Sequence, residues 1–421
     1  MGSSDSTLFG GKFPNLVCQF EDDGHPTKTS HDQRRVERDV AKYLAPLTRY
    51  TQEQIAEMAD YGWLDATTGK PRLLRRKHAA YCRRGLEGLS ASYACLDASR
   101  PWLLYWMIHA LELLDALPDK ECLSRCVGTL KKCAHLDGGF GGGPHQLAHT
   151  APTYAAVLAL FTIGTEEAYE SIDRRAMYRF FMRCKDPDTG CFRVEGNDGE
   201  MDARGLYTVM AVASMLNILT PELKRGAAEF VARCQTFEGG LGGYPGNEAH
   251  GGYSFCAFAA LVILERTDII DTEAFARWIC AKQMRCEGGY QGRTNKLVDA
   301  CYSFWQGAIP LLLKRAGVCR EALQDTARLQ EYILLACQQK EGGLRDKPGK
   351  PRDYYHTCYA LSGLSVAQHS ISSEMPLVWG SDDNVVVETD PVYNVSCRKL
   401  AKGMEYFAKC GPLTHEEAYL M

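Results

Sequence analysis

An aspartate and a cysteine stand two residues apart in the stretch NKLVDACYSFWQG, which runs from Asn295 to Gly307. Asp299 and Cys301 lie among apolar and aromatic residues, where an unpaired buried carboxylate would be costly. His356 occupies the corresponding place in the later segment DYYHTCYAL. Oxygen, sulfur and imidazole nitrogen are all zinc ligands, and three protein ligands leave the open position of a catalytic zinc site. The three residues are therefore a candidate zinc site, although singly they also fit an N-cap, a core cysteine and a core histidine.

The spacing restricts where this site can form. Residues two apart in a helix differ by about 200° around its axis, so Asp299 and Cys301 cannot share a helical face. They can converge where a loop enters a helix, if Asp299 still belongs to the loop. His356 then has to come from a neighbouring copy of the same junction, which requires a repeat architecture.

Such a repeat is visible as a glycine that recurs about every fifty residues. The glycines, spaced by 52, 49, 49 and 54 residues, are Gly138, Gly190, Gly239, Gly288 and Gly342. This period is typical of a helical unit stacked on copies of itself. In each unit one helix is expected to end at a positive-φ glycine cap, and a loop then leads into a second, apolar helix.

Basic residues precede these junctions. Arg293 and Lys296 lie in the loop of the fourth unit, His250 opens the apolar stretch of the third, and Arg204 opens that of the second. Tyr302 adds a hydroxyl group. Together with helix N-termini, these groups would suit a diphosphate if neighbouring junctions lie side by side. Each of them alone also fits an ordinary solvated loop.

Aromatic side chains are frequent in the second helices of the units. They are Trp102, Trp106, Tyr154, Tyr207, Tyr253, Tyr302, Trp305, Tyr355 and Tyr359. Many aromatic residues at helical spacing simply form core, but a ring lined by the rest would enclose a deep apolar cavity for a long hydrocarbon. A hydrocarbon cavity, a diphosphate site and zinc together describe an enzyme that uses an isoprenoid diphosphate.

Composition excludes several other classes. The 421 residues are 45% hydrophobic and carry a net charge of −4, which gives no case for binding nucleic acid or an anionic membrane. No apolar run reaches the length of a membrane span, and no secretory leader opens the chain. The 18 scattered cysteines are typical of reduced thiols in the cytoplasm. The opening MGSSDS fits a loose myristoylation pattern at Gly2.

The expected organisation is all-α. Residues 1–65 are predicted to form an N-terminal extension, with a helix around DQRRVERDVAKYLA, and residues 66–400 the repeat domain. Residues 401–421 are predicted to form a C-terminal tail. No role can be assigned from the residues to the segment at 371–395, which interrupts the last unit.

Longer stretches between about Lys77 and Tyr393 resemble the β subunits of protein prenyltransferases, and most closely the farnesyl-transferring branch of that family. They are YACLDASRPWLLYW, HTAPTYAA, EAHGGYSFC, GRTNKLVDACYSFWQ, RDKPGKPRDYYHTCYALSGLS and DPVYNV. The resemblance implies an α–α toroid of six helical hairpins with zinc at the rim of its cavity. It also implies a heterodimer with an α subunit, which supplies a lysine to the diphosphate site.

The resemblance carries roles to individual positions. The implied zinc ligands are Asp299, Cys301 and His356, and the implied diphosphate-binding residues are His250, Arg293, Lys296 and Tyr302. Arg204 matches a residue near the C-terminal carboxylate of the peptide substrate. The implied lipid- or peptide-pocket residues are Trp102, Trp106, Tyr154, Tyr207, Tyr253, Cys256, Trp305, Tyr355 and Tyr359.

The family transfers farnesyl or geranylgeranyl from its diphosphate to the cysteine of a C-terminal CaaX motif in proteins such as small GTPases. The bulky Trp102 and Tyr359 imply the shorter farnesyl chain, and Asp346 matches a carboxylate that assists with magnesium. The alternatives are a geranylgeranyltransferase type I β subunit and a non-catalytic helical scaffold that binds peptides. A terpene cyclase shares the toroid, but the sequence has no DxDD acid motif.

Overall fold

The computed structural model describes residues 24–44, 51–60, 62–65, 68–196, 198–319, 322–370 and 375–420. The expectation for Gly2 and the first part of the N-terminal extension lie outside these residues. The helix expected within the extension is α1, Lys28–Tyr43, and it is followed by α2, Gln52–Asp60. A Thr27–Ser30 capping box starts α1, and its buried residues Val36 and Val40 fall on one face.

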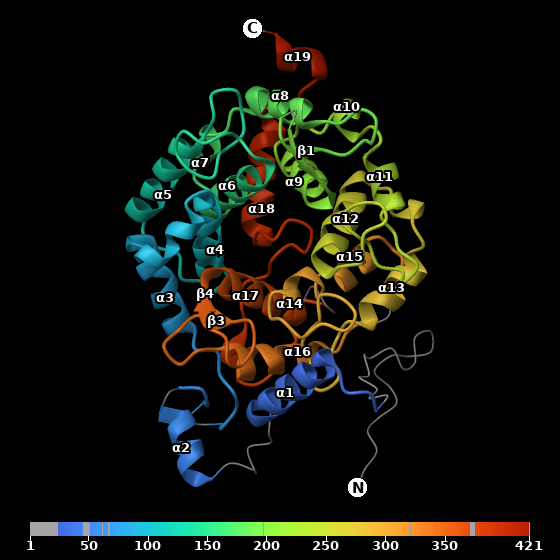
Figure 1. Cartoon of the computed structure of the whole chain (residues 1–421). Helices are drawn as coiled ribbons and strands as arrows, with labels where there is room; N and C mark the ends of the chain where they lie inside the picture. The colour runs from blue at the N-terminus through green and yellow to red at the C-terminus, as the bar shows by residue number, and fades with distance from the viewer. Residues whose placement is uncertain are drawn as a thin grey trace.

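The repeats form a ring of helical hairpins, as Figure 1 shows. The first, outer helices are α3 (Arg75–Glu87), α5 (Lys120–Cys133), α8 (Arg174–Cys184), α11 (Ala227–Arg233), α13 (Thr272–Cys280) and α16 (Thr326–Glu331). The second, inner helices are α4 (Arg100–Leu113), α6 (Thr150–Ile163), α9 (Ala203–Met215), α12 (Gly251–Leu264), α14 (Tyr302–Trp305) with α15 (Ile309–Arg315), and α17 (Tyr354–Gln368). Each inner helix contacts the next, and α17 contacts α4, so the ring closes. Within the described residues this confirms the predicted toroid of six hairpins.

The two layers differ in sequence because they differ in surroundings. The inner helix α6, TAPTYAAVLALFTI, is buried at every position except Ala151. A helix that is apolar all round requires neighbours on every side, which the ring provides. The outer helix α8, RRAMYRFFMRC, instead buries one face through Met177, Phe180 and Phe181 and exposes its arginines to varying degrees.

The repeated glycines do not cap the helices as predicted. The cap of α5 is Ala134, and Gly138 closes a tight turn by donating its N–H to the carbonyl of His135. All five glycines do have positive φ, between 80° and 97°. A Cβ atom on Gly138 would lie 1.9 Å from the carbonyl oxygen of Ala176, in the next outer helix. The glycine is therefore required by the close approach of adjacent repeats as well as by its φ.

The same contact closes the ring. A Cβ atom on Gly342, in the last repeat, would lie 2.1 Å from the carbonyl oxygen of Lys77 in α3, the first outer helix. The last repeat thus meets the first as the other repeats meet their neighbours.

Short elements fill the connections. They are η2 (Ala91–Leu96), α7 (Glu166–Glu170), β1 (Arg193–Glu195), β2 (Asp198–Met201), α10 (Pro221–Lys224), η3 (Thr267–Ile269), the π-helical η4 (Tyr332–Cys337), β3 (Leu344–Arg345), β4 (Arg352–Asp353), η5 (Asp382–Asn384), α18 (Cys397–Lys409) and α19 (His415–Tyr419). β1 pairs with β2 and β3 with β4, both antiparallel. These ribbons are small additions to a helical fold, and α18 crosses the domain boundary expected at residue 400.

The segment before α18 acquires a structural role. Asn384 is fully buried; its side chain accepts from the N–H of Leu73 and donates to the carbonyl of Pro71, which ties the segment to the chain entering α3. Residues 389–396 form a buried loop that lies in the middle of the ring in Figure 1. The segment therefore seals the junction between the last and first hairpins and fills one end of the ring.

Candidate active site

Five inner helices begin with a polar side chain that caps the backbone. Each cap accepts a hydrogen bond from an N–H two or three residues later, and the five residues are His149, Asp202, His250, Asp299 and Asp353. Their spacing follows the repeat, so the closed ring of inner helices carries these caps at equivalent places around its central cavity. The candidate residues cluster along this rim.

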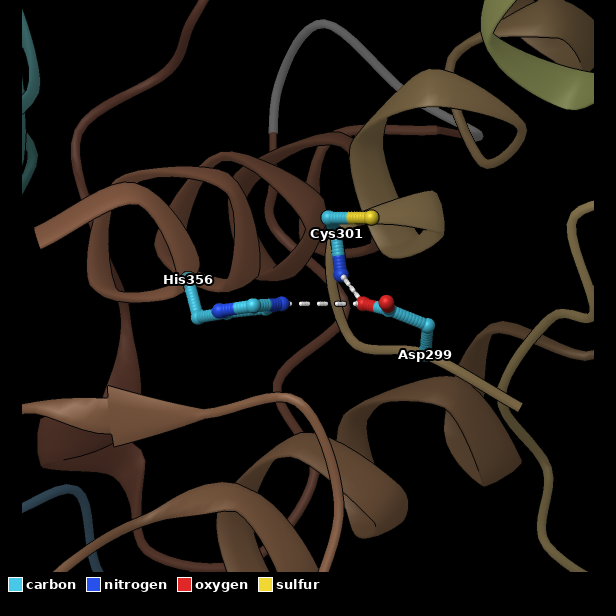
Figure 2. Close-up of side chains that lie close together, drawn as sticks. All are labelled: Asp299, Cys301 and His356. Carbon is cyan, nitrogen blue, oxygen red and sulfur yellow. Dashed lines mark hydrogen bonds and ion pairs between the residues drawn. The ribbon is translucent and has the colours of Figure 1, made fainter. Parts of the chain in front are cut away.

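Asp299, Cys301 and His356 meet as the sequence predicted (Figure 2). Their ligand atoms, one from each residue, all lie within 4.8 Å of one another. Asp299 Oδ1 accepts from the N–H of Cys301 at 2.8 Å and lies 3.2 Å from Nε2 of His356. Asp299 therefore both stabilises the turn that leads into α14 and is a candidate ligand, because its carboxylate folds back toward Cys301.

A fourth residue, Asp353, orients the histidine, and the sequence reasoning missed it. Its Oδ2 accepts from Nδ1–H of His356 at 2.7 Å, which directs Nε2 toward Asp299 and Cys301. Nε2 is buried and, despite its closeness to Asp299, makes no hydrogen bond of good geometry. This buried imidazole nitrogen, together with the facing carboxylate and thiol, forms a set of donor atoms that could bind a divalent metal ion.

The charge of each of the three groups depends on its neighbours. Burial opposes the charge of Asp299, but the adjacent His356 lowers its pKa to about 2. Burial likewise opposes the charge of His356, but Asp299 and Asp353 raise its pKa to about 10. Burial and the neighbouring Asp299 raise the pKa of the Cys301 thiol well above its usual value. A metal ion would have to displace protons from both His356 and Cys301.

His250 and Tyr302 form a second pair on the rim. Nδ1 of His250 accepts from the N–H of Gly252 at 3.1 Å, so Nε2 carries the proton and donates to the Tyr302 hydroxyl at 3.0 Å. The hydroxyl hydrogen of Tyr302 is then free to point at a ligand. Burial, with the positive charge of Arg293, lowers the pKa of His250 and favours this neutral form.

The basic residues occupy different positions. Nη1 of Arg293 pairs with Glu248 at 2.6 Å, and Lys296 is exposed with no ion-pair partner in the described part of the chain. Arg204 lies over the Tyr253 ring, and Asp202 and Glu200 hold it through Nε and Nη2, which leaves Nη1 without a partner among the described residues. Arg204 therefore belongs to the cavity wall.

A cavity of about 550 Å³ opens beside this rim. All nine predicted pocket residues and Arg204 line it, together with His250 and Tyr302. Asp299, Cys301 and His356 adjoin the cavity through their neighbours Tyr302 and Tyr355. Four further lining residues were not predicted from the sequence: Ser99, Ala151, Thr208 and Gly252. Ala151 and Gly252 lie two positions after the capping residues His149 and His250, just as Cys301 lies two positions after Asp299. This shared spacing could have predicted them.

The loop of residues 389–396 lies behind part of the aromatic wall, where tyrosine hydroxyls bond to its backbone. Hydroxyls of Tyr105 and Tyr207 donate to the carbonyls of Asn394 and Val392 at 2.7 and 2.5 Å, and the Tyr154 and Tyr207 hydroxyls bond each other at 2.9 Å. Trp102 packs 5.8 Å from Tyr154, ring centroid to ring centroid. Hydrogen bonds at the hydroxyl ends of Tyr154 and Tyr207 therefore hold this part of the aromatic wall in place.

Asp346 lies close to the candidate metal ligands. Its carbonyl accepts from the N–H of Ala300, between Asp299 and Cys301, at 3.0 Å. Its carboxylate pairs with the buried ammonium of Lys347. Burial, with the charge of Asp299, raises the pKa of Asp346.

Comparisons with known proteins agree with this geometry. Residues 73–395 match the prenyltransferase alpha-alpha toroid domain family. The chain is 36% identical to protein farnesyltransferase subunit beta of Arabidopsis thaliana, over 88% of this chain and 92% of the relative. It is 39% identical to the subunit of that name from Saccharomyces cerevisiae, over 88% of this chain and 90% of the relative.

More distant similarities extend to other prenyltransferases. The geranylgeranyl transferase type-1 subunit beta of Arabidopsis thaliana is 30% identical, over 69% of this chain and 84% of the relative. A solved structure, Candida albicans protein geranylgeranyltransferase-I complexed with GGPP, matches with a TM-score of 0.66 at 20% identity, over 80% of this chain and 99% of that chain. At this identity the structural match supports the fold alone.

Proposed function

The chain belongs to the farnesyltransferase β-subunit family of protein prenyltransferases, and from this premise we propose how its residues transfer a farnesyl group. The substrates are farnesyl diphosphate and a protein ending in a CaaX motif, and the product is a thioether at the CaaX cysteine. The bond between the lipid and its diphosphate breaks as the sulfur–carbon bond forms. The observation that carries the proposal is the convergence of Asp299, Cys301 and His356 beside the aromatic cavity.

Zinc is the proposed ion at these three residues. One carboxylate, one thiolate and one imidazole suit zinc, and a fourth position remains for the substrate's sulfur. When bound, zinc lowers the pKa of a coordinating thiol so that it is a thiolate at neutral pH. Asp353 contributes by holding the His356 tautomer whose Nε2 is the ligand atom.

The leaving diphosphate is assigned to the part of the rim next to the candidate metal ligands, where Tyr302 follows Cys301. Tyr302 donates its free hydroxyl hydrogen to a diphosphate oxygen, and His250 keeps that hydroxyl in place. Arg293 and Lys296 supply positive charge as the carbon–oxygen bond breaks, and their exposure lets them move onto the ligand. Magnesium beside Asp346 would assist; Lys347 must first release that carboxylate.

The lipid is proposed to lie along the aromatic wall. The nine predicted apolar and aromatic lining residues give a hydrocarbon its contacts, and Trp102 with Tyr154 limits how far it extends. Arg204 presents Nη1 to the C-terminal carboxylate of the peptide. A geranylgeranyl-transferring enzyme is the second candidate, and the length of the cavity decides between them.

A heterodimer with an α subunit is part of the proposal, as is action in the cytoplasm. All cysteines in the described ranges are free, in keeping with a reducing compartment. Among the described residues, no helix is long and apolar enough to cross a membrane.

The test is a transfer assay with the chain co-expressed with an α subunit. Both lipid diphosphates compete for peptides varied at the final residue, and the metal content of the same preparation is measured. We expect farnesyl transfer and zinc at the Asp299 site. An active preparation free of metal, or a preference for geranylgeranyl, would contradict the corresponding part of the proposal.

A further inference from the structure

A second cluster of metal-binding residue types lies away from the cavity, where α1 docks on the fourth repeat. Glu37 comes from α1, and Cys286 and Glu287 come from the turn that precedes Gly288. Their ligand atoms, one from each residue, lie within 4.8 Å of one another. The proposed prenyl transfer uses none of these residues.

Glu287 differs from the acidic residues at equivalent places in other repeats. Asp137 and Glu341 precede the same glycine in their turns and are exposed, whereas Glu287 is fully buried. The residues that cover it come from α1, where Gln33 is itself buried. Without α1, the repeat fold would leave the carboxylate of Glu287 accessible to water. Docking of α1 therefore removes this carboxylate from water.

The buried carboxylate is incompletely satisfied. Gln33 Nε2 donates to Oε1 of Glu287 at 2.9 Å and to Oε1 of Glu37 at 3.1 Å, while Oε2 of Glu287 is buried with no hydrogen-bond partner. Burial, reinforced by the charge of Glu37, raises the pKa of Glu287 to about 7, although the hydrogen bond from Gln33 opposes this. Two carboxylates held this close require a shared proton or a cation between them.

Arg328, whose positive charge acts on Glu287, is committed elsewhere. Arg328 pairs with Glu331 through Nη1 and donates from Nη2 to the backbone carbonyl of Cys286 at 2.8 Å. No side chain among the described residues forms an ion pair with Glu37 or Glu287, so a bound cation would supply the missing charge.

We propose that Glu37, Cys286 and Glu287 form a second divalent-cation site, which fastens α1 to the turn of the fourth repeat. The donor set of two carboxylates and one thiolate suits zinc or a cation of similar softness. Gln33 can turn its amide to present Oε1 as a further ligand, since its amide nitrogen already bridges both carboxylates. The same turn leads through Gly292 into Arg293 and Lys296, so the ion would also brace the loop that carries these residues.

Ion counting on the assembled enzyme tests this site independently of transfer activity. The chain, co-expressed with its α partner, is equilibrated with excess Zn²⁺ and its bound zinc is measured. We expect two ions per chain in the wild type, and one in Cys286→Ser and Glu37→Gln. Cys410→Ser, at another exposed cysteine, is the matched control and should keep both. A single ion in the wild type, or two ions in Cys286→Ser, would overturn the proposal.

Proteolysis supplies a second readout, because α1 contains Arg34, Arg35 and Arg38. If cleavage requires undocked α1, Zn²⁺ at tenfold above its dissociation constant should slow trypsin cleavage there by about tenfold in the wild type. Cys286→Ser should show no such protection. Equal cleavage of the wild type with and without Zn²⁺ would contradict a fastening role.

The two sites can fail separately. This inference does not depend on the proposed transfer reaction, because loss of the second ion should leave farnesyl transfer measurable. Loss of zinc at Asp299, Cys301 and His356 should instead abolish transfer while leaving protection of α1 unchanged.

Discussion

At the scale of single residues, Asp299 combines two roles that usually belong to different side chains. Its Oδ1 caps the backbone at Cys301, and the same carboxylate faces His356. The cap explains why a two-residue spacing works, since the loop conformation it stabilises folds the carboxylate back over the following cysteine. The structural interpretation of Asp299 therefore holds, and it is compatible with the proposed role of the same carboxylate as a metal ligand.

The first prediction concerns the thiolate ligand. Cys301→Ala should remove the bound metal and reduce farnesyl transfer by at least about a hundredfold, because two remaining ligands cannot hold zinc tightly. Metal analysis and single-turnover kinetics measure the two effects. Cys234 is also buried but ends the outer helix α11, and Cys234→Ala is therefore the control. This variant should keep the bound metal and the transfer rate. A metal-free Cys301→Ala enzyme with full activity would refute the site.

Metal binding should depend steeply on pH. In the metal-free protein the pKa of His356 is about 10 and that of Cys301 lies well above its usual value, so both carry protons at neutral pH. Binding then releases about two protons, and affinity should rise by up to about a hundredfold per pH unit. Competition with a chelator of known pH dependence measures this slope. An affinity that is flat or falls with pH would contradict the protonation states assigned here.

Tyr302 should act on the leaving group. Tyr302→Phe removes the hydroxyl that His250 holds, and the loss of one hydrogen bond to a charged ligand should slow the chemical step by about ten- to a hundredfold. Binding of the lipid diphosphate should weaken less than the rate falls. Tyr290→Phe, in which a buried tyrosine bonded to Gln324 loses its hydroxyl, is the control. An unchanged single-turnover rate in Tyr302→Phe would remove the hydroxyl from the mechanism.

At the scale of elements, the turn between outer and inner helices is what repeats. Its glycine is required because the backbone of the next outer helix lies too close for a Cβ atom. The capping residue that follows marks the start of the inner helix. Similar side chains at equivalent turns therefore meet around one rim, and chemistry can be shared between neighbouring repeats.

Two glycines of the third repeat allow two causes of destabilisation by a side chain to be distinguished: a clash with a neighbouring helix and an unfavourable backbone φ. Gly239 has φ +95°, and a Cβ atom there would lie 2.3 Å from the carbonyl oxygen of Ala274. Gly246 has φ +87° with nothing within 4 Å. Gly239→Ala should lower the free energy of unfolding by about 3 kcal/mol, and Gly246→Ala by about 1 kcal/mol. Chemical denaturation measures both, and equal losses would show that the contact between repeats is unimportant.

At the scale of the whole molecule, ring closure brings the cavity-lining helices together, and a loop late in the chain supports their aromatic wall. Hydroxyls of Tyr105 and Tyr207 are bonded to the loop of residues 389–396, far along the chain from the helices that carry them. These hydrogen bonds therefore hold the aromatic wall of the cavity in place. The depth of the cavity consequently depends on the closed ring and not on a single helix.

Lipid choice should respond to the wall residue Trp102. Trp102→Thr removes the indole that packs on Tyr154, and the deeper cavity should accept geranylgeranyl diphosphate at the expense of farnesyl. We expect the ratio of kcat/KM values to shift by at least about tenfold, as measured by competition between the lipids. Trp278→Phe, buried outside the cavity, should leave the ratio unchanged. An unshifted ratio in Trp102→Thr would place the limit on chain length elsewhere.

Much of this molecule could be predicted from the sequence because its information is local and repeated. The glycine period predicted stacked helical units, the family resemblance implied the closed ring, and the register of Asp299, Cys301 and His356 predicted a shared junction. The role of the glycines was misassigned, since only the contact with the next helix reveals it. The register of the caps was available but unused, and it would have pointed to Ala151 and Gly252.

The sequence by itself determined the helical repeat, the apolar inner layer and the residue types at the rim, because helix period and turn chemistry depend on near neighbours along the chain. Only the tertiary structure decided the partners: Asp353 behind His356, the free hydroxyl hydrogen of Tyr302, the loop bonded to Tyr207, and α1 over Glu287. These contacts join residues from different elements. They exist only once the ring has closed, since closure sets which side chains face each other and which are removed from water.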